Sequence, residues 1–252
     1  MASVRNDPQP ATDHLATGLT PDESDVSGEP DSSSATRRAL LAGHRHDQST
    51  AMRMLEDPDP TVRVVALGAL SRSGVLTDET LINCLTDSDW HVRRRACEVI
   101  PRREGSAVDE SVLIAAVVSV LADPEALVAE SAAWALGELV PRDPHVLGDS
   151  RDLGDANSAD PPDVLGPLED MVLNHRDPLC REAAVAAVGA IGDLTSLDTV
   201  LLALEDKPPI RRRAAVALAA FDDPRADEAL ERCLNDRDWQ VRQAAEDLRP
   251  RP

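Results

Sequence analysis

Apolar residues recur along the chain at the spacing of one helix face, and aspartate or proline interrupts them at regular places. In residues 55–70, LEDPDPTVRVVALGAL, the side chains of Val62, Ala66 and Leu70 fall on one side of a helix, with Arg63 beside them. A second amphipathic stretch precedes most such segments, as in DETLINCL at 78–85. The pattern predicts pairs of short helices, with an Asp or Pro turn inside each pair.

This order of residues occurs six times, at 55–70, 85–100, 121–136, 173–188, 204–218 and 234–248. The intervals between the first leucines of these segments are 30, 36, 52, 31 and 30 residues. Because neither helix of a pair can bury its apolar stripe alone, neighbouring pairs are expected to stack in series. The sequence therefore predicts an all-α fold, an α-solenoid of about six helical hairpins.

The segments resemble HEAT-like repeats of the short type first named from phycobilisome lyases, over roughly residues 47–249. The resemblance implies stacking rather than a particular activity. It also implies a structural ladder that links adjacent repeats, in which the Asp before each second helix pairs with the Arg six positions on. The residues at these positions are Asp57, Arg63, Asp87, Arg93, Arg181, Asp206, Arg211, Asp236 and Arg242.

Two repeats depart from this ladder pattern. The third repeat has Ala129 where the arginine belongs, and the fourth has His175 where the aspartate belongs. The fifth has its two residues, Asp206 and Arg211, only five positions apart, because its turn is one residue shorter. The ladder is therefore not expected to be complete at the third and fourth repeats.

Composition divides the chain into four regions. Residues 1–35 are rich in Pro, Asp, Ser and Thr and are predicted to be a disordered acidic N-terminal tail. Residues 36–140 hold the first three repeats behind a capping helix, and residues 164–252 hold the last three. Between them, residues 141–163 form an acidic insertion loop rich in Pro, Gly and Asp, which accounts for the 52-residue interval.

Charge and aromatic content narrow the classes of function. The formal net charge is −20, with 46 acidic against 26 basic residues, and Lys207 is the only lysine. Such a chain repels nucleic acids and anionic membranes at long range, and its composition resembles that of proteins from salt-loving archaea. Aromatic residues make up 2%, so the interior must consist of Ala, Val, Leu and Ile.

The sequence favours a soluble cytoplasmic protein. Its N-terminus has no apolar run typical of a signal peptide, and no uninterrupted apolar stretch is long enough to span a membrane. The four cysteines include no C-x-x-C pair, which fits a reducing compartment.

Catalytic, cofactor and metal sites are not predicted. The cysteines fall mostly on repeat positions and are expected to be small buried residues rather than nucleophiles. Deoxyhypusine hydroxylases, which share this repeat fold, carry His-Glu pairs that bind a di-iron centre, whereas none of the six histidines here is followed by Glu. His44 and His46 alone would make a poor metal site.

The second helices carry the candidate partner-binding residues. Trp134 has acidic residues around it and is either a partner contact or half-buried between repeats. The arginine pairs 94–95 and 212–213 are not explained by the ladder, and either bind a partner or offset neighbouring carboxylates. The full set is Arg94, Arg95, Glu98, Glu130, Trp134, Glu182, Arg212 and Arg213.

The leading hypothesis is a non-catalytic scaffold that binds another protein on the concave surface of the solenoid. The alternative is a HEAT-like repeat enzyme or enzyme subunit of the bilin-lyase or deoxyhypusine-hydroxylase type, the latter disfavoured by the missing His-Glu pairs. A third reading, a DNA glycosylase of the HEAT-like class, is disfavoured by the overall charge. Neither a nucleic acid nor a membrane is the expected partner.

Overall fold

The computed structural model describes residues 32–45, 47–103, 110–140 and 162–248. Residues 1–31 of the expected tail and 141–161 of the expected insertion lie outside the described residues. Helix α1 (Ser32–Arg45) begins three residues before the expected end of that tail. Its Ala35 and Ala39 pack with Val62 of the following hairpin in a small apolar cluster.

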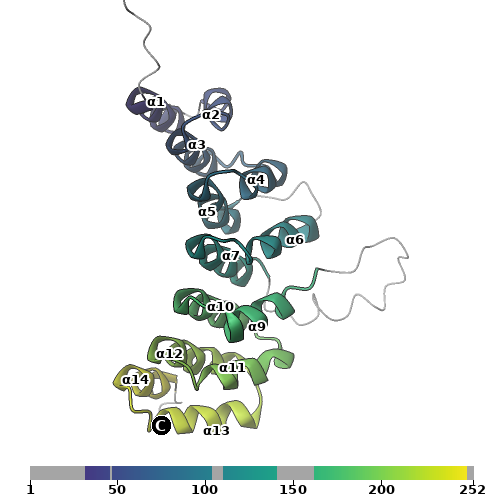
Figure 1. The fold of residues 1–252 in the computed structure, drawn as a ribbon, viewed down its shortest axis with the longest axis vertical. Helices are drawn as coiled ribbons and strands as arrows, with labels where there is room; N and C mark the ends of the chain where they lie inside the picture. The colour runs from purple at the N-terminus through teal and green to yellow at the C-terminus, as the bar shows by residue number, and fades with distance from the viewer. Residues whose placement is uncertain (1–31, 46, 104–109, 141–161, 249–252) are drawn as a thin grey trace, which may run out of the picture. The chain divides into compact units, whose positions relative to one another are not determined.

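After α1, the described residues form six helical hairpins and contain no strand, which confirms the predicted all-α solenoid (Figure 1). Each hairpin has a first helix and a second helix. The pairs are α2 (Gln48–Met54) with α3 (Pro60–Arg72), α4 (Asp78–Leu85) with α5 (Trp90–Val99), α6 (Glu110–Val120) with α7 (Ala126–Leu139), α9 (Leu165–Asn174) with α10 (Pro178–Ile191), α11 (Leu197–Ala203) with α12 (Pro208–Ala217), and α13 (Pro224–Cys233) with α14 (Trp239–Leu248). Three short 3-10 turns accompany them: η1 (Ile100–Arg102), η3 (Leu194–Ser196) and η4 (Leu218–Ala220).

Paired aspartates explain where the second helices begin. In the second hairpin, Asp89 Oδ1 accepts a hydrogen bond from the backbone N–H of His91 at 2.9 Å, which caps α5. Asp87, two residues earlier, accepts from the backbone N–H of Asp89 at 2.8 Å and so closes the turn. Trp90 occupies the first position of α5, as Pro60 does in α3.

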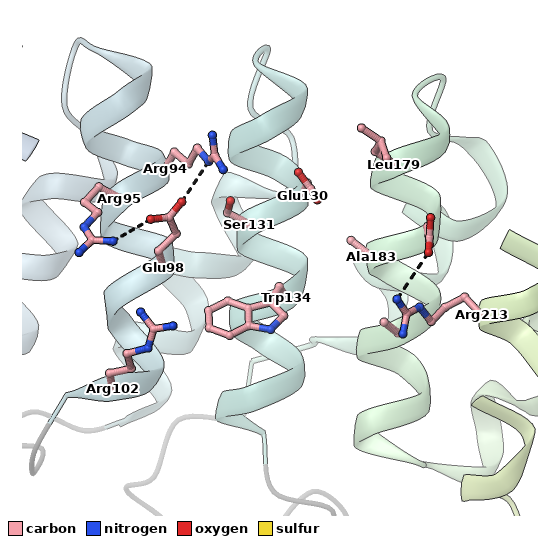
Figure 2. Close-up of a pocket in the computed structure, with 12 residues that line it drawn as sticks. Arg94, Arg95, Glu98, Arg102, Glu130, Ser131, Trp134, Leu179, Ala183 and Arg213 are labelled. Carbon is pink, nitrogen blue, oxygen red and sulfur yellow. Dashed lines mark hydrogen bonds and ion pairs between the residues drawn. The ribbon is translucent and has the colours of Figure 1, made fainter. Parts of the chain in front are cut away.

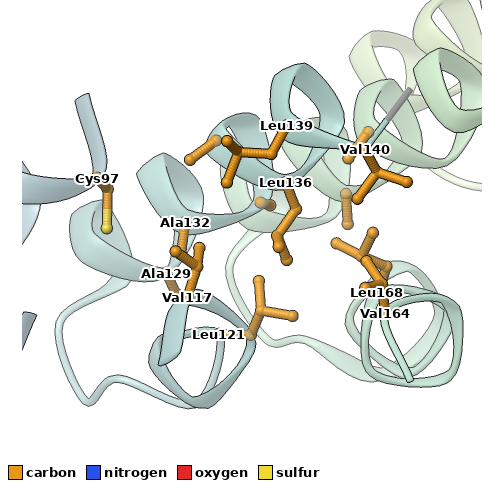
Figure 3. Close-up of a cluster of buried hydrophobic side chains, with 14 of the residues drawn as sticks. Cys97, Val117, Leu121, Ala129, Ala132, Leu136, Leu139, Val140, Val164 and Leu168 are labelled. Carbon is orange, nitrogen blue, oxygen red and sulfur yellow. The ribbon is translucent and has the colours of Figure 1, made fainter. Parts of the chain in front are cut away.

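The second helices contact one another in chain order, from α3 through α5, α7, α10 and α12 to α14. Small residues allow this close stacking. A Cβ added at Gly189 of α10 would lie 2.9 Å from the Cα of Ala217 in α12, and one at Gly137 of α7 would lie 2.9 Å from the Cα of Ala187 in α10. The core between the two rows is made mostly of Leu, Val, Ile and Ala, including Leu136 and Leu168, as the composition predicts, with a few Cys, Met and Phe side chains among them (Figure 3).

Arginines of the second helices form ion pairs across the repeat boundaries. Arg63 Nη2 lies 2.7 Å from Asp87 Oδ1, and Arg63 Nε donates to the other oxygen of that carboxylate at 2.9 Å. The same two-pronged contact joins Arg93 to Asp123, Arg181 to Asp206 and Arg211 to Asp236. Each of these arginine–aspartate ion pairs is one rung of the ladder and links one repeat to the next.

The expected pairing within a repeat takes a different form. Arg63 Nη1 donates at 2.9 Å to the backbone carbonyl of Asp57, six residues earlier, and not to its carboxylate. Arg242 makes the same contact with the Asp236 carbonyl at 2.7 Å. The Asp57 carboxylate instead accepts from the backbone N–H of Asp59 at 2.9 Å, and the carboxylate partner of Arg63 belongs to the following repeat.

In the last two rungs the ion pair shifts the pKa of the aspartate. A hydrogen bond from Arg181 lowers the pKa of Asp206, and one from Arg211 lowers the pKa of Asp236. In return, the Asp236 carboxylate raises the pKa of Arg211. Because the aspartate pKa values are lowered on folding, these rungs stabilise the stack at neutral pH and lose that contribution as the pH falls through the lowered values.

No such rung joins the third and fourth repeats, because Ala129 and His175 fall on the same junction. His175 nevertheless keeps the turn: its Nδ1 accepts from the backbone N–H of Asp177 at 3.1 Å, as the Asp87 carboxylate does for Asp89. At this junction an outer hollow of about 520 Å³ lies between α6 and α9. Ala129 and His175 therefore interrupt the ladder at a single junction.

Candidate functional site

An open groove of about 770 Å³ crosses four consecutive second helices, α5, α7, α10 and α12 (Figure 2). Ten of its twelve side chains come from positions one, two and five after the ladder position, which project from the same face of each helix, and Arg102 and Leu179 are the exceptions. The lining residues are Arg94, Arg95, Glu98, Arg102, Glu130, Ser131, Trp134, Leu179, Glu182, Ala183, Ala186 and Arg213. Seven of the eight predicted partner-binding residues are among them, and Arg212 lines a smaller hollow beside Arg213.

The α5 end of the groove carries two arginines that share one carboxylate. Arg95 Nη1 donates to Glu98 Oε2 at 2.9 Å, and Arg94 Nε lies 3.1 Å from Glu98 Oε1. The Arg94 contact is close enough for an ion pair, but it is not aligned as a hydrogen bond. Gly68 of α3 gives room to this cluster, since an added Cβ there would lie 3.0 Å from Arg95 Nη2.

The α12 end repeats this arrangement across a helix boundary. Arg212 Nη2 and Arg213 Nη2 lie 3.4 and 3.5 Å from the same Oε1 of Glu182, which projects from α10. These contacts are longer than those of the ladder rungs. Both predicted readings of the arginine pairs are therefore compatible with the geometry, because the arginines offset carboxylates and also face the groove.

Between the two arginine clusters lies the apolar part of the groove. Trp134 of α7 is 38% exposed, and the guanidinium carbon of Arg102 lies 5.9 Å from its ring centroid, within cation–π range. Leu179, in the first turn of α10, is 53% exposed. Arg102 and Leu179 were not predicted from the sequence, because neither lies at a position that the repeat pattern singles out.

Glu130 lies in the middle of the groove, on α7. Burial raises the pKa of its carboxyl group, while the nearby Arg94 acts in the opposite direction. The groove therefore combines arginines at its ends with a partly desolvated acid and an indole near its centre. Such a surface can form charge-assisted hydrogen bonds and apolar contacts with one ligand.

The four cysteines do not line the groove. All four cysteines are buried and free of disulfides, and burial raises the pKa of Cys97 to about 12 and that of Cys84 to about 11. The described residues contain no group of three or more His, Cys, Asp or Glu side chains arranged to hold a metal ion. The side chains of His44 and His46 lie outside the described residues. None of the described helices combines the length and apolar character that crossing a membrane requires.

The fold is that of HEAT and armadillo repeat solenoids. Residues 165–249, which span α9 to α14, match the family model of HEAT repeats. The X-ray structure of YibA from E. coli is similar, with a TM-score of 0.56 and 13% identity over 88% of this chain and 75% of that one. No curated protein matches the chain.

Two further solved structures are similar. The complex of CpcE and CpcF of phycocyanin lyase from Nostoc sp. PCC7120 gives a TM-score of 0.51 and 21% identity, over 79% of this chain and 74% of that one. An engineered protein gives 0.54 and 17% identity, over 85% of this chain and 62% of that one. At such identities these likenesses establish the fold alone.

Proposed function

We propose that this chain is a non-catalytic interaction module that binds another protein in the groove of its second helices. The observation that carries the proposal is the exposed Trp134 between two arginine clusters, on helices whose order is fixed by the stack. Tryptophan and arginine contribute disproportionately to protein interfaces. A stack of rigid helices also holds such residues in place before the partner arrives, which lowers the entropic cost of binding.

Affinity purification of the full chain from its native cell tests this proposal. A partner protein is expected to co-purify with the unaltered chain and with Trp239→Ala, whose indole is 63% exposed in the first turn of α14 and away from the groove. The Trp134→Ala variant is expected to lose that partner. Retention of the partner by Trp134→Ala, or recovery of no partner at all, would contradict the proposal.

An enzyme of the bilin-lyase type is the second candidate, favoured by the similarity in fold to the phycocyanin lyase complex. Incubation of the chain with a tetrapyrrole, followed by gel filtration and absorbance spectroscopy, distinguishes the two. If the chain is an interaction module, the protein is expected to elute from the column without bound tetrapyrrole. A tight coloured complex that depends on groove residues would instead favour the lyase reading.

The acidic, lysine-poor composition supports action in the cytoplasm of a salt-loving archaeon. Salt screens the repulsion among the excess carboxylates, since the Debye length falls to about 3 Å at 1 M. Thermal unfolding followed by circular dichroism is therefore expected to shift to higher temperature as KCl is raised. A midpoint that stays constant or falls with KCl would contradict a high-salt habitat.

A further inference from the structure

We infer that the groove takes an acidic, extended peptide segment of its partner, with carboxylates at its two ends and an apolar side chain between them. The inference rests on the proposed function and specifies the chemistry of the ligand. It is argued from charge, from the apolar centre and from the length of the groove.

The groove carries a small local surplus of positive charge. Its lining holds four arginines, Arg94, Arg95, Arg102 and Arg213, against the three glutamates Glu98, Glu130 and Glu182. At the α12 end, Arg212 joins Arg213 beside Glu182, and Asp247 lines the same small hollow and offsets part of their charge. This surplus stands out in a chain whose net charge is −20, and it favours a ligand with carboxylates.

The arginines at both ends are also partly open to a ligand. Nε of Arg94 and Nε of Arg213 are buried and have no hydrogen-bond partner among the described residues. The side chains of these two residues are nevertheless 39% and 41% exposed, so a ligand can contact their exposed parts. A carboxylate matches the fork of a guanidinium group in a two-pronged geometry, as the ladder rungs of this chain already illustrate.

The centre of the groove is complementary to a different kind of ligand side chain. Trp134, Leu179 and Ala183 present apolar surface between the two clusters. Glu130 and Arg102 also line this part of the groove, one acidic and one basic, so the centre has no surplus of either charge. The complementary ligand residue is therefore uncharged and apolar.

The length of the groove sets the length of the segment. Its two arginine clusters lie on α5 and on α12, which are separated by three helix-to-helix steps along the row of second helices. At about 8–10 Å per step, this distance is roughly 24–30 Å. An extended chain advances about 3.3 Å per residue, so roughly eight residues separate the two acidic ends.

A nucleic acid fits this groove less well, although it too is anionic. Glu98, Glu130 and Glu182 interleave with the arginines, and a continuous phosphate backbone would face each of them. A peptide, unlike a phosphate backbone, can carry its negative charges only at the residues that lie opposite the arginines.

Selection from a displayed library of random 12-residue peptides tests the inference, with the full chain as bait at a salt concentration where circular dichroism shows it folded. The decisive variant is Arg94→Gln with Arg213→Gln, because Glu98 keeps Arg95 and Glu182 keeps Arg212. The matched control is Arg53→Gln with Arg225→Gln, which removes the same charge from the exposed side of first helices α2 and α13.

Peptides with Asp or Glu about eight residues apart and an apolar residue between them are expected to be enriched at least tenfold by the unaltered chain and by the control. The decisive variant is expected to lose most of that enrichment, fivefold or more. Basic or neutral peptides whose enrichment depends on Trp134 would overturn the acidic inference and leave the proposed function standing. Failure of Trp134→Ala to change any enrichment, or displacement of bound peptide by a dT20 oligonucleotide at lower concentration than by poly-glutamate, would overturn the peptide groove itself.

Discussion

Ala129 and His175 occupy, on two adjoining repeats, the positions that Arg93 and Asp123 occupy at the preceding junction. Arg93 and Asp123 form a rung there, with Arg93 Nε 2.7 Å from Asp123 Oδ2. At the junction of α7 with α10 the rung is absent, and Gly137 instead brings the two helices close together. The loss of both partners together is physically sensible, because a half-buried charge without its counterion would destabilise the fold.

Restoring both partners is predicted to rebuild the missing rung. Ala129→Arg alone should destabilise the chain, since Ala129 is fully buried. Adding His175→Asp should recover part of that loss, with a favourable coupling of about 1–2 kcal/mol between the two substitutions. Urea denaturation of the unaltered chain, the two single variants and the double variant measures this coupling. A coupling of zero or of opposite sign would mean that the rung geometry does not extend to this junction.

The arginine–aspartate rungs are predicted to contribute more to the free energy of unfolding than the contacts between arginines and backbone carbonyls. Arg211→Gln removes a bidentate pair with Asp236 and should lower the free energy of unfolding by about 2–3 kcal/mol. Arg242→Gln is the matched control, because within the described residues Arg242 bonds only to a backbone carbonyl. It should cost about 1 kcal/mol or less. Equal losses in denaturant titrations would contradict the assignment of the rungs as the main tie.

Substitution by alanine is predicted to affect stability differently at two glycines of the second helices, although their neighbours in sequence are similar. Gly189→Ala places a methyl group 2.9 Å from the backbone of Ala217 and should destabilise the chain by about 1–3 kcal/mol. Gly68→Ala meets only the flexible ends of Arg95 and Arg72, and better helix propensity should offset these contacts to within about 1 kcal/mol. Thermal unfolding of both variants checks this, and a loss at Gly68 as large as at Gly189 would be the contrary result.

Much of the fold could be predicted because each repeat carries its own local signals. The aspartate pairs at 57–59 and 87–89 mark the start of second helices, and the apolar spacing marks the buried face. The partner of each ladder arginine could not be read from one repeat. Arg63 reaches Asp87 because neighbouring repeats stack at a particular offset, and that offset depends on packing between helices rather than on spacing along the chain.

Most of the candidate site could also be predicted from the repeat pattern, but residues outside that pattern could not. Second-helix positions such as Arg94, Trp134 and Glu182 could be grouped because the repeat fixes which face they share. Arg102 could not, because it lies in the 3-10 turn η1 beyond the regular helix. Its approach to Trp134 depends on how that turn ends, for which the repeat pattern gives no signal.

Site-specific photo-crosslinking in the native cell most directly tests the claim that the second helices form the binding surface. A photoreactive amino acid would replace Leu179, which is 53% exposed in the groove, or Leu202, which is 59% exposed on the first helix α11. The account predicts a crosslink to one discrete partner protein from position 179 and none from position 202. A partner crosslinked from position 202 and not from position 179 would contradict it.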